Sequence, residues 1–489
     1  MLLFPLNSKL EIFVFILNII MTFVIIFLER KTPKSTYAWL LFLWIIPILG
    51  FVFYLFLSQN LTRRKIYRYD TPEEEEYQKM MLGKSLIHFG SDDDTQKQLF
   101  HQYHNNIDYN INTCEAFFTN NNCIDIYTDG HAKFEALFKA IEEAKSSIHL
   151  EYYIIKYDDL GRRLLTLLTR KASEGVEVRL LYDEMGGRYI PRRKLKEFAR
   201  AGGEYGAFFP TKLRVVNLRV NYRDHRKIAV IDGQTAFIGG YNIGDEYLGK
   251  NPKMGYWRDT HLRISGYAVY ELQRRFFLDW RTSDNIDPID LDPGCIGRYY
   301  PDMPKICGAG IQIVSSGPDD PNQVIKQDFL RMITNAKEHI YIQSPYFVPD
   351  ESVLESLKIA ILSGVDVRIM IPDKPDHIFI YWATLAYVGE LVEYGAKIYI
   401  YENGFLHAKT ITVDDEICAV GSCNFDIRSF SLNFESNAFV YDQGTATALR
   451  HIFHRDIEKS QRYDLETYRS RPRRIKIKES ISRLFAPLL

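Results

Sequence analysis

The stretch HRKIAVID, residues 225–232, places a histidine, a lysine and an aspartate close together, and HAKTITVD, residues 407–414, repeats the pattern. An imidazole exchanges protons near neutral pH and is also a nucleophile, whereas an ammonium group stabilises anionic oxygens. Attack on a phosphodiester needs a nucleophile, a proton donor for the leaving alkoxide and positive charge on the non-bridging oxygens. The candidate catalytic residues are therefore the six motif residues His225, Lys227, Asp232, His407, Lys409 and Asp414.

Both copies of the motif continue in the same way. Six residues after the aspartate, the first copy reads GGYN (239–242) and the second reads GSCN (421–424), which gives the template HxKx4Dx6GxxN. One HxKx4D is a few-per-cent accident in a chain of this length, but two extended copies are not. A third HxK, His131-Ala-Lys133, has no aspartate at the matching position and opens a predicted helix, so we interpret it as incidental.

The spacing inside the motif predicts how its side chains point. Side chains alternate along a strand, so His225 and Lys227 project from one face, and His407 and Lys409 do the same. Asp232 and Asp414 have the opposite parity and end their strands, although they belong to the motif. Their predicted role is to bind turn amides.

The elements around the motifs also repeat. From about residue 113, short β-rich runs alternate with amphipathic helical runs, which indicates α/β layers. AKSSIHLEYYII (144–155) is echoed by AKEHIYIQSPYFV (336–348), and EGVEVRLLYD (174–183) by SGVDVRIMIPD (363–373). We predict two tandem α/β domains, 113–300 and 301–460, that share one site around a pseudo-twofold axis.

The N-terminal 69 residues have a different composition. Residues 12–28 and 37–57 are apolar runs, and a helix needs roughly 20 such residues to cross a bilayer. We predict a transmembrane hairpin; the alternatives are a cleaved signal peptide and two buried core helices. Glu-Arg-Lys at 29–31, where a cleavage site would stand, argues against the signal peptide. Residues 70–112 are acidic, and we predict a solvated linker there.

Charge and cysteine content bear on partners and compartment. A net charge of −1 provides no global basic field for nucleic acid. Basic residues at the outer ends of the hairpin outnumber those of its loop, which favours a cytoplasmic catalytic body. The six cysteines include no CxxC pair and no zinc-like cluster, so we predict reduced thiols. The dispersed carboxylates predict a site without metal, and nothing indicates the oligomeric state.

The C-terminal residues 461–489 combine a basic cluster with an apolar helical pattern. Such a tail is typical of a helix that lies on anionic lipid, with docking on the protein body as the alternative. Residues 188–224 mix basic and aromatic side chains, and two interpretations stay open: an entrance for an anionic headgroup, or a solvated helix followed by a hairpin.

The paired motifs resemble those of the phospholipase D superfamily over residues 113 to 460. More narrowly, the chain is similar to the bacterial cardiolipin synthases of the phospholipase D type. The resemblance rests on ERKTPKSTYAWLLFLWIIPILGFVFYLFLSQN, HRKIAVIDGQTAFIGGYNIGDEYLG, WRDTHLRISG, SPYFVPD and HAKTITVDDEICAVGSCNFDIRSFSLNFESNAFVYD. Cys423 departs from the family, where alanine is common.

The resemblance implies roles for the site residues. One histidine, for which we favour His225, forms a phosphohistidine, and the other protonates the leaving alcohol. Two lysines and two asparagines bind the phosphate oxygens, and two carboxylates orient the histidines. The residues added to the motif set in this way are Asn242, Asn424, Asp259 and Glu435. A surface salt bridge to Arg258 or Arg263 is the alternative for Asp259, and we interpret His261 as a satisfied strand histidine.

The implied reaction joins two phosphatidylglycerol molecules into cardiolipin and releases glycerol, with no cofactor and with anionic membrane lipid as the partner. A membrane-bound phospholipase D that releases phosphatidic acid would carry the same motifs. A membrane-anchored nuclease is the third alternative, and the near-zero charge argues against it. A lipid-binding protein without activity would be expected to lack a motif residue, and all six are present.

Overall fold

The computed structural model describes residues 8–28, 33–46, 50, 54, 66–67, 72–88, 94–208, 221–283, 296–303 and 307–485. The chain divides into two compact units. One comprises residues 1–65 with 211–223, and the other, the body, comprises residues 66–210 with 224–489.

The N-terminal unit contains a pair of helices. α1 (Ser8–Phe23) continues as η1 (Val24–Leu28), and α2 (Pro33–Ile45) follows. The amide of Asn18 donates to the Leu43 carbonyl at 3.2 Å, while many apolar side chains of both helices are exposed. No described helix is long and apolar enough to cross a membrane. Much of the predicted second span lies outside the described residues, at 47–49, 51–53 and 55–57.

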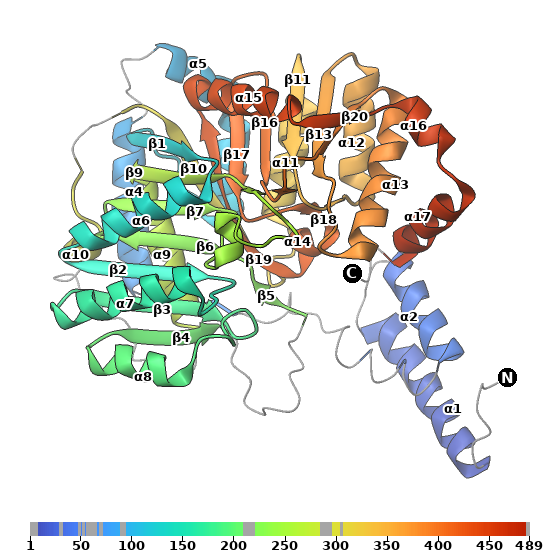
Figure 1. Cartoon of the computed structure of the whole chain (residues 1–489), viewed down its shortest axis with the longest axis horizontal. Coiled ribbons are helices and arrows are strands. Elements are labelled where there is room, and N and C mark those ends of the chain that lie inside the picture. Colours follow the sequence, from blue (N-terminus) through green and yellow to red (C-terminus); the bar gives the residue numbers. More distant parts are fainter. Residues whose placement is uncertain are drawn as a thin grey trace. The chain divides into compact units, whose positions relative to one another are not determined.

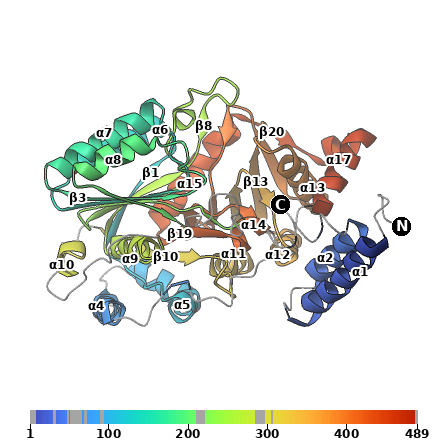
Figure 2. The ribbon, with the colours of Figure 1, turned by 90° about the horizontal axis from the view of Figure 1, so that it is seen from below.

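The first half of the body is built on a mixed sheet in the order β1-β9-β7-β6-β2-β3-β4. β2, β3 and β4 are parallel, and the other pairs are antiparallel. Helices α6, α7 and α8 cover one face and α9 lies on the other (Figure 2). The bounds are β1 (Asn122–Tyr127), α6 (Gly130–Glu143), β2 (Ser147–Tyr152), α7 (Asp159–Ser173), β3 (Glu177–Asp183), α8 (Arg192–Arg200), β4 (Glu204–Phe208), β6 (Lys227–Ile231), β7 (Thr235–Gly239), β9 (His261–Gly266) and α9 (Ala268–Trp280).

The second half repeats this order as β10-β19-β17-β16-β11-β13-β14, with β20 added at the edge (Figure 1). β11, β13 and β14 are again the parallel strands. The predicted tandem α/β repeat is therefore confirmed. The bounds are β10 (Gly310–Ser316), α11 (Val324–Asn335), β11 (His339–Gln343), α12 (Glu351–Leu362), β13 (Asp366–Pro372), α13 (Ile378–Tyr394), β14 (Lys397–Tyr401), β16 (Thr410–Val413), β17 (Ile417–Gly421), β19 (Asn433–Tyr441), α15 (Gln443–Ile457) and β20 (Ser460–Tyr463).

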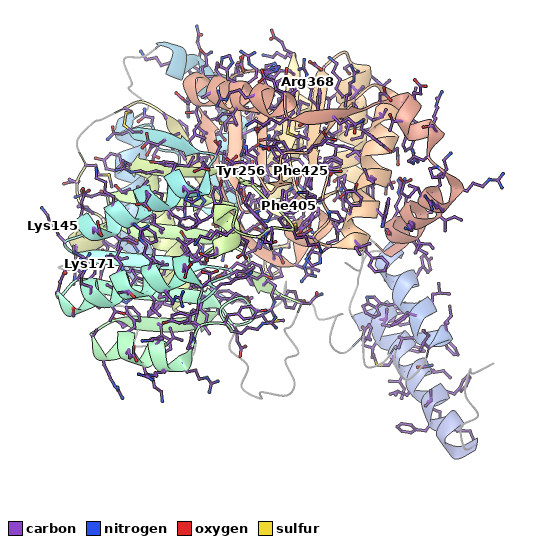
Figure 3. The ribbon with its side chains drawn as sticks, viewed as in Figure 1. Lys145, Lys171, Tyr256, Arg368, Phe405 and Phe425 are labelled. Carbon is purple, nitrogen blue, oxygen red and sulfur yellow. A yellow bond between two sulfur atoms is a disulfide. The ribbon has the colours of Figure 1, made fainter. Side chains whose placement is uncertain are left out.

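Short elements join the two halves. β8 (Trp257–Arg258) of the first half pairs in parallel with β15 (Phe405–Leu406) of the second. The Phe405 amide donates to the Tyr256 carbonyl at 2.8 Å, and both side chains lie in the middle of Figure 3. The remaining elements are β5 (Arg223–Asp224), η2 (Asp245–Leu248), α10 (Ile296–Tyr299), β12 (Phe347–Val348), β18 (Phe425–Asp426), α14 (Ile427–Ser431), α16 (Leu465–Ser470) and α17 (Arg473–Phe485).

The structure differs from the solvated linker expected over residues 70–112. This segment forms α4 (Pro72–His88) and α5 (Asp94–Cys114). Leu99, Tyr103 and Ile107 recur every four residues on one face of α5 and are buried in the core of the second half. On α4, Glu74 is buried in an ion pair with Arg274 of α9 at 2.7 Å. The acidic composition of this segment therefore did not indicate that α5 is amphipathic or that Glu74 is paired with Arg274.

The prediction that all cysteines are reduced is wrong for two of them. Cys123 of β1 and Cys307 form a disulfide across a sequence separation of 184 residues. Cys114, Cys418 and Cys423 are free thiols, and Cys295 lies outside the described residues. The pairing follows from the chain path, because Thr119 next to β1 exchanges backbone hydrogen bonds with Ile311 of β10 and brings residue 307 to the same edge.

Candidate active site

The two HxK segments enter the site through backbone contacts with the opposite half. The His225 amide donates to the Phe434 carbonyl of β19 at 2.9 Å, and the His407 amide donates to the Arg258 carbonyl of β8 at 2.7 Å. Both imidazoles are largely buried, with side chains that are 12% and 9% exposed. The strands that carry the motif are thus fixed where the two halves meet.

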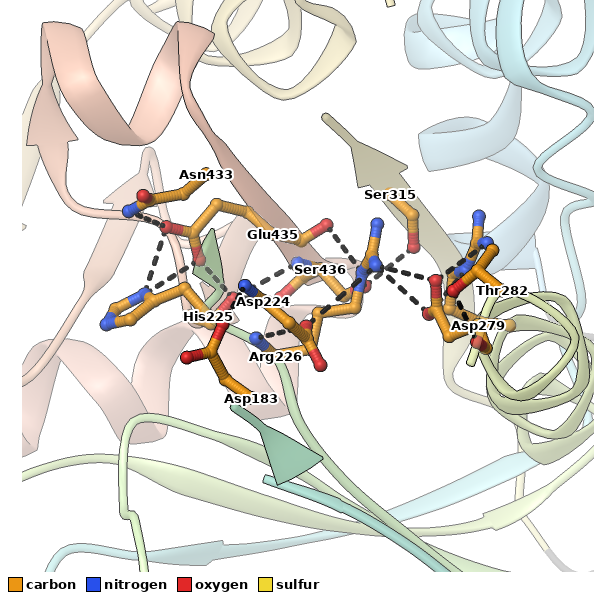
Figure 4. A network of polar contacts seen from close by, with 12 residues as sticks. Asp183, Asp224, His225, Arg226, Asp279, Thr282, Ser315, Asn433, Glu435 and Ser436 are labelled. Carbon is orange, nitrogen blue, oxygen red and sulfur yellow. Dashed lines mark hydrogen bonds and ion pairs between the residues drawn. The ribbon is translucent and has the colours of Figure 1, made fainter. Parts of the chain in front are cut away.

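The supporting carboxylates are exchanged between the halves. Nδ1 of His225 lies 3.0 Å from both carboxylate oxygens of Glu435, which belongs to the second half (Figure 4). Nδ1 of His407 lies 2.5 Å from Oδ2 of Asp259, which belongs to the first half. Asp259 and Glu435 are both fully buried, which overturns the surface salt bridge considered for Asp259. Each half therefore supplies one histidine and the carboxylate for the other, and leaves both Nε2 atoms available for chemistry.

Residues that the sequence reasoning missed hold the carboxylates. The Ser422 hydroxyl donates to Glu435, and the Asn433 amide donates to the same carboxylate at 3.1 Å. The Thr260 amide donates to Asp259 at 2.7 Å. Two signals could have found the first pair: Ser422 lies inside the GxxN segment, and Asn433 is two residues from Glu435 on one strand face.

Both motif lysines lie in one electrostatic environment with the two carboxylates. Burial lowers the pKa of Lys227 to about 7 and that of Lys409 to about 8, although Glu435 and Asp259 oppose the shift in both cases. Each lysine also disfavours the charged form of both histidines. Nζ of Lys409 lies 3.0 Å from Nδ1 of His407. The two motif copies, far apart in sequence, therefore meet in one site.

Burial also sets the protonation of the other titratable groups. It lowers the pKa of His225 to about 4, and burial with Lys409 next to it lowers the pKa of His407. Burial alone would raise the pKa of Asp259, but Lys409 and His407 outweigh it and hold that pKa below its usual range. Near neutral pH both imidazoles of the free protein are thus uncharged, the form in which Nε2 is a nucleophile or base.

The motif aspartates lie away from this chemistry. Asp232 accepts hydrogen bonds from the amides of Lys145, Ser146 and Ser147 at 2.7–2.9 Å. Asp414 accepts the equivalent bonds from residues 337–339. Figure 3 shows Lys145 at the outer edge of the first half, far from Tyr256 and Phe405. This geometry matches the predicted turn-binding role.

The motif asparagines hold local loops. Oδ1 of Asn242 accepts from the Ile154 amide at 3.1 Å, and its Nδ2 donates to the Tyr247 hydroxyl at 2.9 Å. Nδ2 of Asn424 donates to the Ser429 hydroxyl at 3.2 Å. The Asn424 side chain also hydrogen-bonds the Asp426 carboxylate.

Two further histidines, His131 and His261, lie in the first half. His131 lies in α6 and is exposed, as expected for an incidental HxK. His261 is buried on β9, but neither ring nitrogen has a hydrogen-bond partner among the described residues, so it is not the satisfied histidine that we expected. Burial accordingly lowers its pKa well below the usual range.

A buried arginine links the first motif to two neighbouring elements. Arg226, between the histidine and lysine of the motif, is 1% exposed. Its Nη1 donates to both oxygens of Asp279 on α9 at 3.0 Å, and its Nε donates to the Ser436 hydroxyl at 3.0 Å (Figure 4). Arg226 therefore connects α9, the motif and β19, the strand that carries Glu435. Among the described residues, no group of acidic, histidine or cysteine side chains is arranged to hold a metal ion.

Comparison with known proteins identifies the family to which this site belongs. The family model described as "Cardiolipin synthase, PLD-like domain" matches residues 137–279 and 329–457, which correspond to the two halves. The chain belongs to the cardiolipin synthases of the phospholipase D superfamily. A second model, "Phospholipase_D-nuclease N-terminal", matches residues 16–59.

Curated cardiolipin synthases are similar over nearly the whole chain. "Major cardiolipin synthase ClsA" of Bacillus subtilis is 48% identical and covers 97% of this chain and 98% of its own. "Cardiolipin synthase" of Oceanobacillus iheyensis is 47% identical with the same coverage. Among solved structures, phosphatidylserine synthase of Haemophilus influenzae has a TM-score of 0.57 at 15% identity, covering 75% of this chain and 95% of that one, and so shares the fold.

Proposed function

We propose that the chain is a phosphatidyltransferase that makes cardiolipin and glycerol from two phosphatidylglycerol molecules. The observation that carries the proposal is the pair of histidines, each held at Nδ1 by a carboxylate of the opposite half, beside two lysines. Such a site can attack a phosphodiester from one side and protonate its leaving group from the other.

The first step forms a phosphatidyl-histidine. Nε2 of His225 attacks phosphorus, the bond from phosphorus to the glycerol oxygen breaks, and His407 gives its Nε2 proton to that oxygen. Lys227 and Lys409, with Asn242 and Asn424, bind the non-bridging oxygens. Charge on the bound phosphate favours the protonated forms of His407 and of both lysines, which burial alone disfavours.

The second step returns the enzyme to its starting state. His407 removes the proton from the terminal hydroxyl of a second phosphatidylglycerol, and that oxygen attacks phosphorus. The phosphorus–nitrogen bond to His225 breaks and cardiolipin leaves. Glu435 and Asp259 keep each Nδ1–H donated inward, so that the reacting nitrogen is Nε2 in both steps.

We further propose that the protein is held at anionic membrane lipid by its two ends. The exposed apolar side chains of α1 and α2 support insertion of the N-terminal helices as the transmembrane hairpin expected from sequence. At the other end, Ile477, Ile481 and Leu484 of α17 are exposed in one line, while Glu479 and Ser482 on the opposite side are buried. Docking on the body and contact with lipid, which the sequence left as alternatives, are thus compatible.

We propose a cytoplasmic position for the body. The basic residues at the outer ends of the hairpin support it. The disulfide between Cys123 and Cys307 opposes it, because disulfides persist mainly in oxidising compartments.

The test of the function is a product assay on purified full-length protein supplied with phosphatidylglycerol alone. We expect cardiolipin and glycerol from the native protein by mass spectrometry, and neither from His225→Ala or His407→Ala. His131→Ala, which removes the exposed histidine of the incidental HxK, is the matched control and should retain activity. Phosphatidic acid as the sole product would instead identify a hydrolase with the same site.

A further inference from the structure

Large apolar side chains are exposed at the same position in both halves of the body. Met185 and Tyr189, in the segment after β3, are 39% and 51% exposed. Ile378 and Phe379, after β13, are 65% and 57% exposed. β3 and β13 are equivalent strands of the repeat, so the two segments are equivalent as well. The fold therefore exposes apolar side chains to solvent at the equivalent structural position in both halves.

The first segment is attached to the His225 motif. Asp183 at the end of β3 accepts a hydrogen bond from the Met185 amide at 2.9 Å, and its second oxygen accepts from the Asp224 amide at 3.1 Å. Asp224 directly precedes His225. The ring of Tyr153, against whose backbone Gly186 packs, lies 5.0 Å from the His225 ring.

The second segment is attached to the His407 motif. The Tyr346 hydroxyl donates to Asp376, and Asp376 is one of the carboxylates that favour the charged form of Lys409. Tyr346 also interacts electrostatically with Tyr153 of the first half. Ile378 and Phe379 follow Asp376 after one intervening residue, His377. The two exposed segments therefore flank the same catalytic centre.

Positive charge lies next to the second segment. α17 packs along α13 in the same direction, with Nζ of Lys478 5.0 Å from the Trp382 ring and Arg483 4.7 Å from the Tyr387 ring (Figures 1 and 2). The first residues of α17, which include Arg473 and Arg474, therefore extend toward the first turn of α13. Basic side chains beside exposed apolar ones complement an anionic bilayer surface.

We propose that Met185, Tyr189, Ile378 and Phe379 form a rim around the active site that inserts into an anionic bilayer. The inference rests on the proposed function. The phosphate of a lipid must reach the buried histidines while its acyl chains remain in an apolar environment. A rim in contact with the bilayer lets the headgroup enter without exposing the chains to water.

A fluorescence measurement tests the rim without requiring activity. An environment-sensitive label is placed at Phe379→Cys in the full-length protein lacking Cys114 and Cys295, and the protein is reconstituted in phosphatidylglycerol vesicles. Spin labels on the acyl chains should quench it at least about two-fold more than the same label at Ile359→Cys. Ile359 of α12 is 64% exposed and precedes β13, at the opposite end of that strand from the rim, so it is the matched control.

Equal quenching at the two positions would overturn the proposal. A label at position 379 that becomes protected with rising protein concentration and no lipid would also overturn it, in favour of a contact between two copies of the chain.

A kinetic measurement tests what the rim does. Ile378→Ser/Phe379→Ser should lower cardiolipin formation from vesicles by on the order of ten-fold, while leaving it within about two-fold for short-chain phosphatidylglycerol dispersed as monomers. The control Ile359→Ser/Leu362→Ser removes two equally exposed apolar side chains and should change neither rate. Equal loss on both substrates, or no loss on vesicles, would contradict the rim. A native protein that makes no cardiolipin from either substrate would contradict the proposed function instead, and the quenching result would still stand.

Discussion

Glu435 of the second half lies in hydrogen-bond contact with the histidine of the first motif. Its carboxylate faces Nδ1 of His225 and is itself held by Ser422 and Asn433. Glu435→Gln keeps the size but removes the charge, so the imidazole loses the partner that fixes its tautomer. We expect turnover to fall by on the order of 10²- to 10⁴-fold, with slower formation of the covalent phosphatidyl-enzyme by intact-protein mass spectrometry.

The exposed Glu458→Gln, in the same half, is the matched control and should retain activity. A Glu435→Gln enzyme that forms the covalent species at the native rate would exclude His225 as the nucleophile and assign that role to His407.

The lowered pKa values of Lys227 and Lys409 predict that activity falls at alkaline pH. The pKa of Lys227 is lowered to about 7 and that of Lys409 to about 8, so the ammonium charge that we propose binds phosphate is present below these values and lost above them. We expect kcat/KM, which reports the free enzyme, to decline as pH rises through about 7 to 8. Because the two lysines interact, the observed values belong to the pair.

The variant Lys227→Arg remains charged over this range, and part of its alkaline limb should move to higher pH, even if its maximal rate is lower. A native profile that stays flat to pH 9.5 would show that neither lysine loses its charge in the free enzyme.

At this scale the sequence predicts positions better than pairings. Repetition of HxKx4Dx6GxxN identified the histidines and lysines, and the resemblance to the family supplied Asp259 and Glu435. The sequence could not indicate that each carboxylate contacts the histidine of the other half. These contacts depend on the pairing of β8 with β15 over a long sequence separation. Ser422 and Asn433 are ordinary polar residues until the fold places them against Glu435.

At the scale of elements, α5 is where composition and structure differ most. Its acidic and polar residues predicted a solvated segment, yet Leu99, Tyr103 and Ile107 are part of the core of the second half. We therefore expect Ile107→Ala to destabilise the protein by about 2–5 kcal/mol, as for other large-to-small changes in a core. Thermal unfolding of the detergent-solubilised protein measures the change.

Gln98→Ala, at an exposed position of the same helix, is the control and should stay within about 0.5 kcal/mol of the native protein. Equal stability of the two variants would mean that α5 contributes nothing to the core. The strands of the two halves were easier to predict, because their apolar runs repeat in sequence and in space.

At the scale of the whole molecule, the disulfide closes the chain between β1 and the segment that leads into β10. No spacing pattern predicted it, because Cys123 and Cys307 meet only through the path of the backbone. Its removal frees a long loop in the unfolded state. We expect Cys307→Ser to lower the free energy of unfolding by about 2–4 kcal/mol, with a lower midpoint of thermal unfolding.

Reductant provides the matched comparison for this variant. It should lower the midpoint of the native protein to that of Cys307→Ser and leave the variant unchanged, whereas a native protein insensitive to reductant would carry free thiols at both positions.

Cys123 and Cys307 also report on which side of the membrane the body lies. Alkylation of intact cells before lysis should modify both thiols only if the body faces a reducing compartment, since a disulfide is inert to the reagent. Modified thiols would support the cytoplasmic position favoured by the basic residues, and protected ones would support an extracytoplasmic body whose rim meets the outer leaflet.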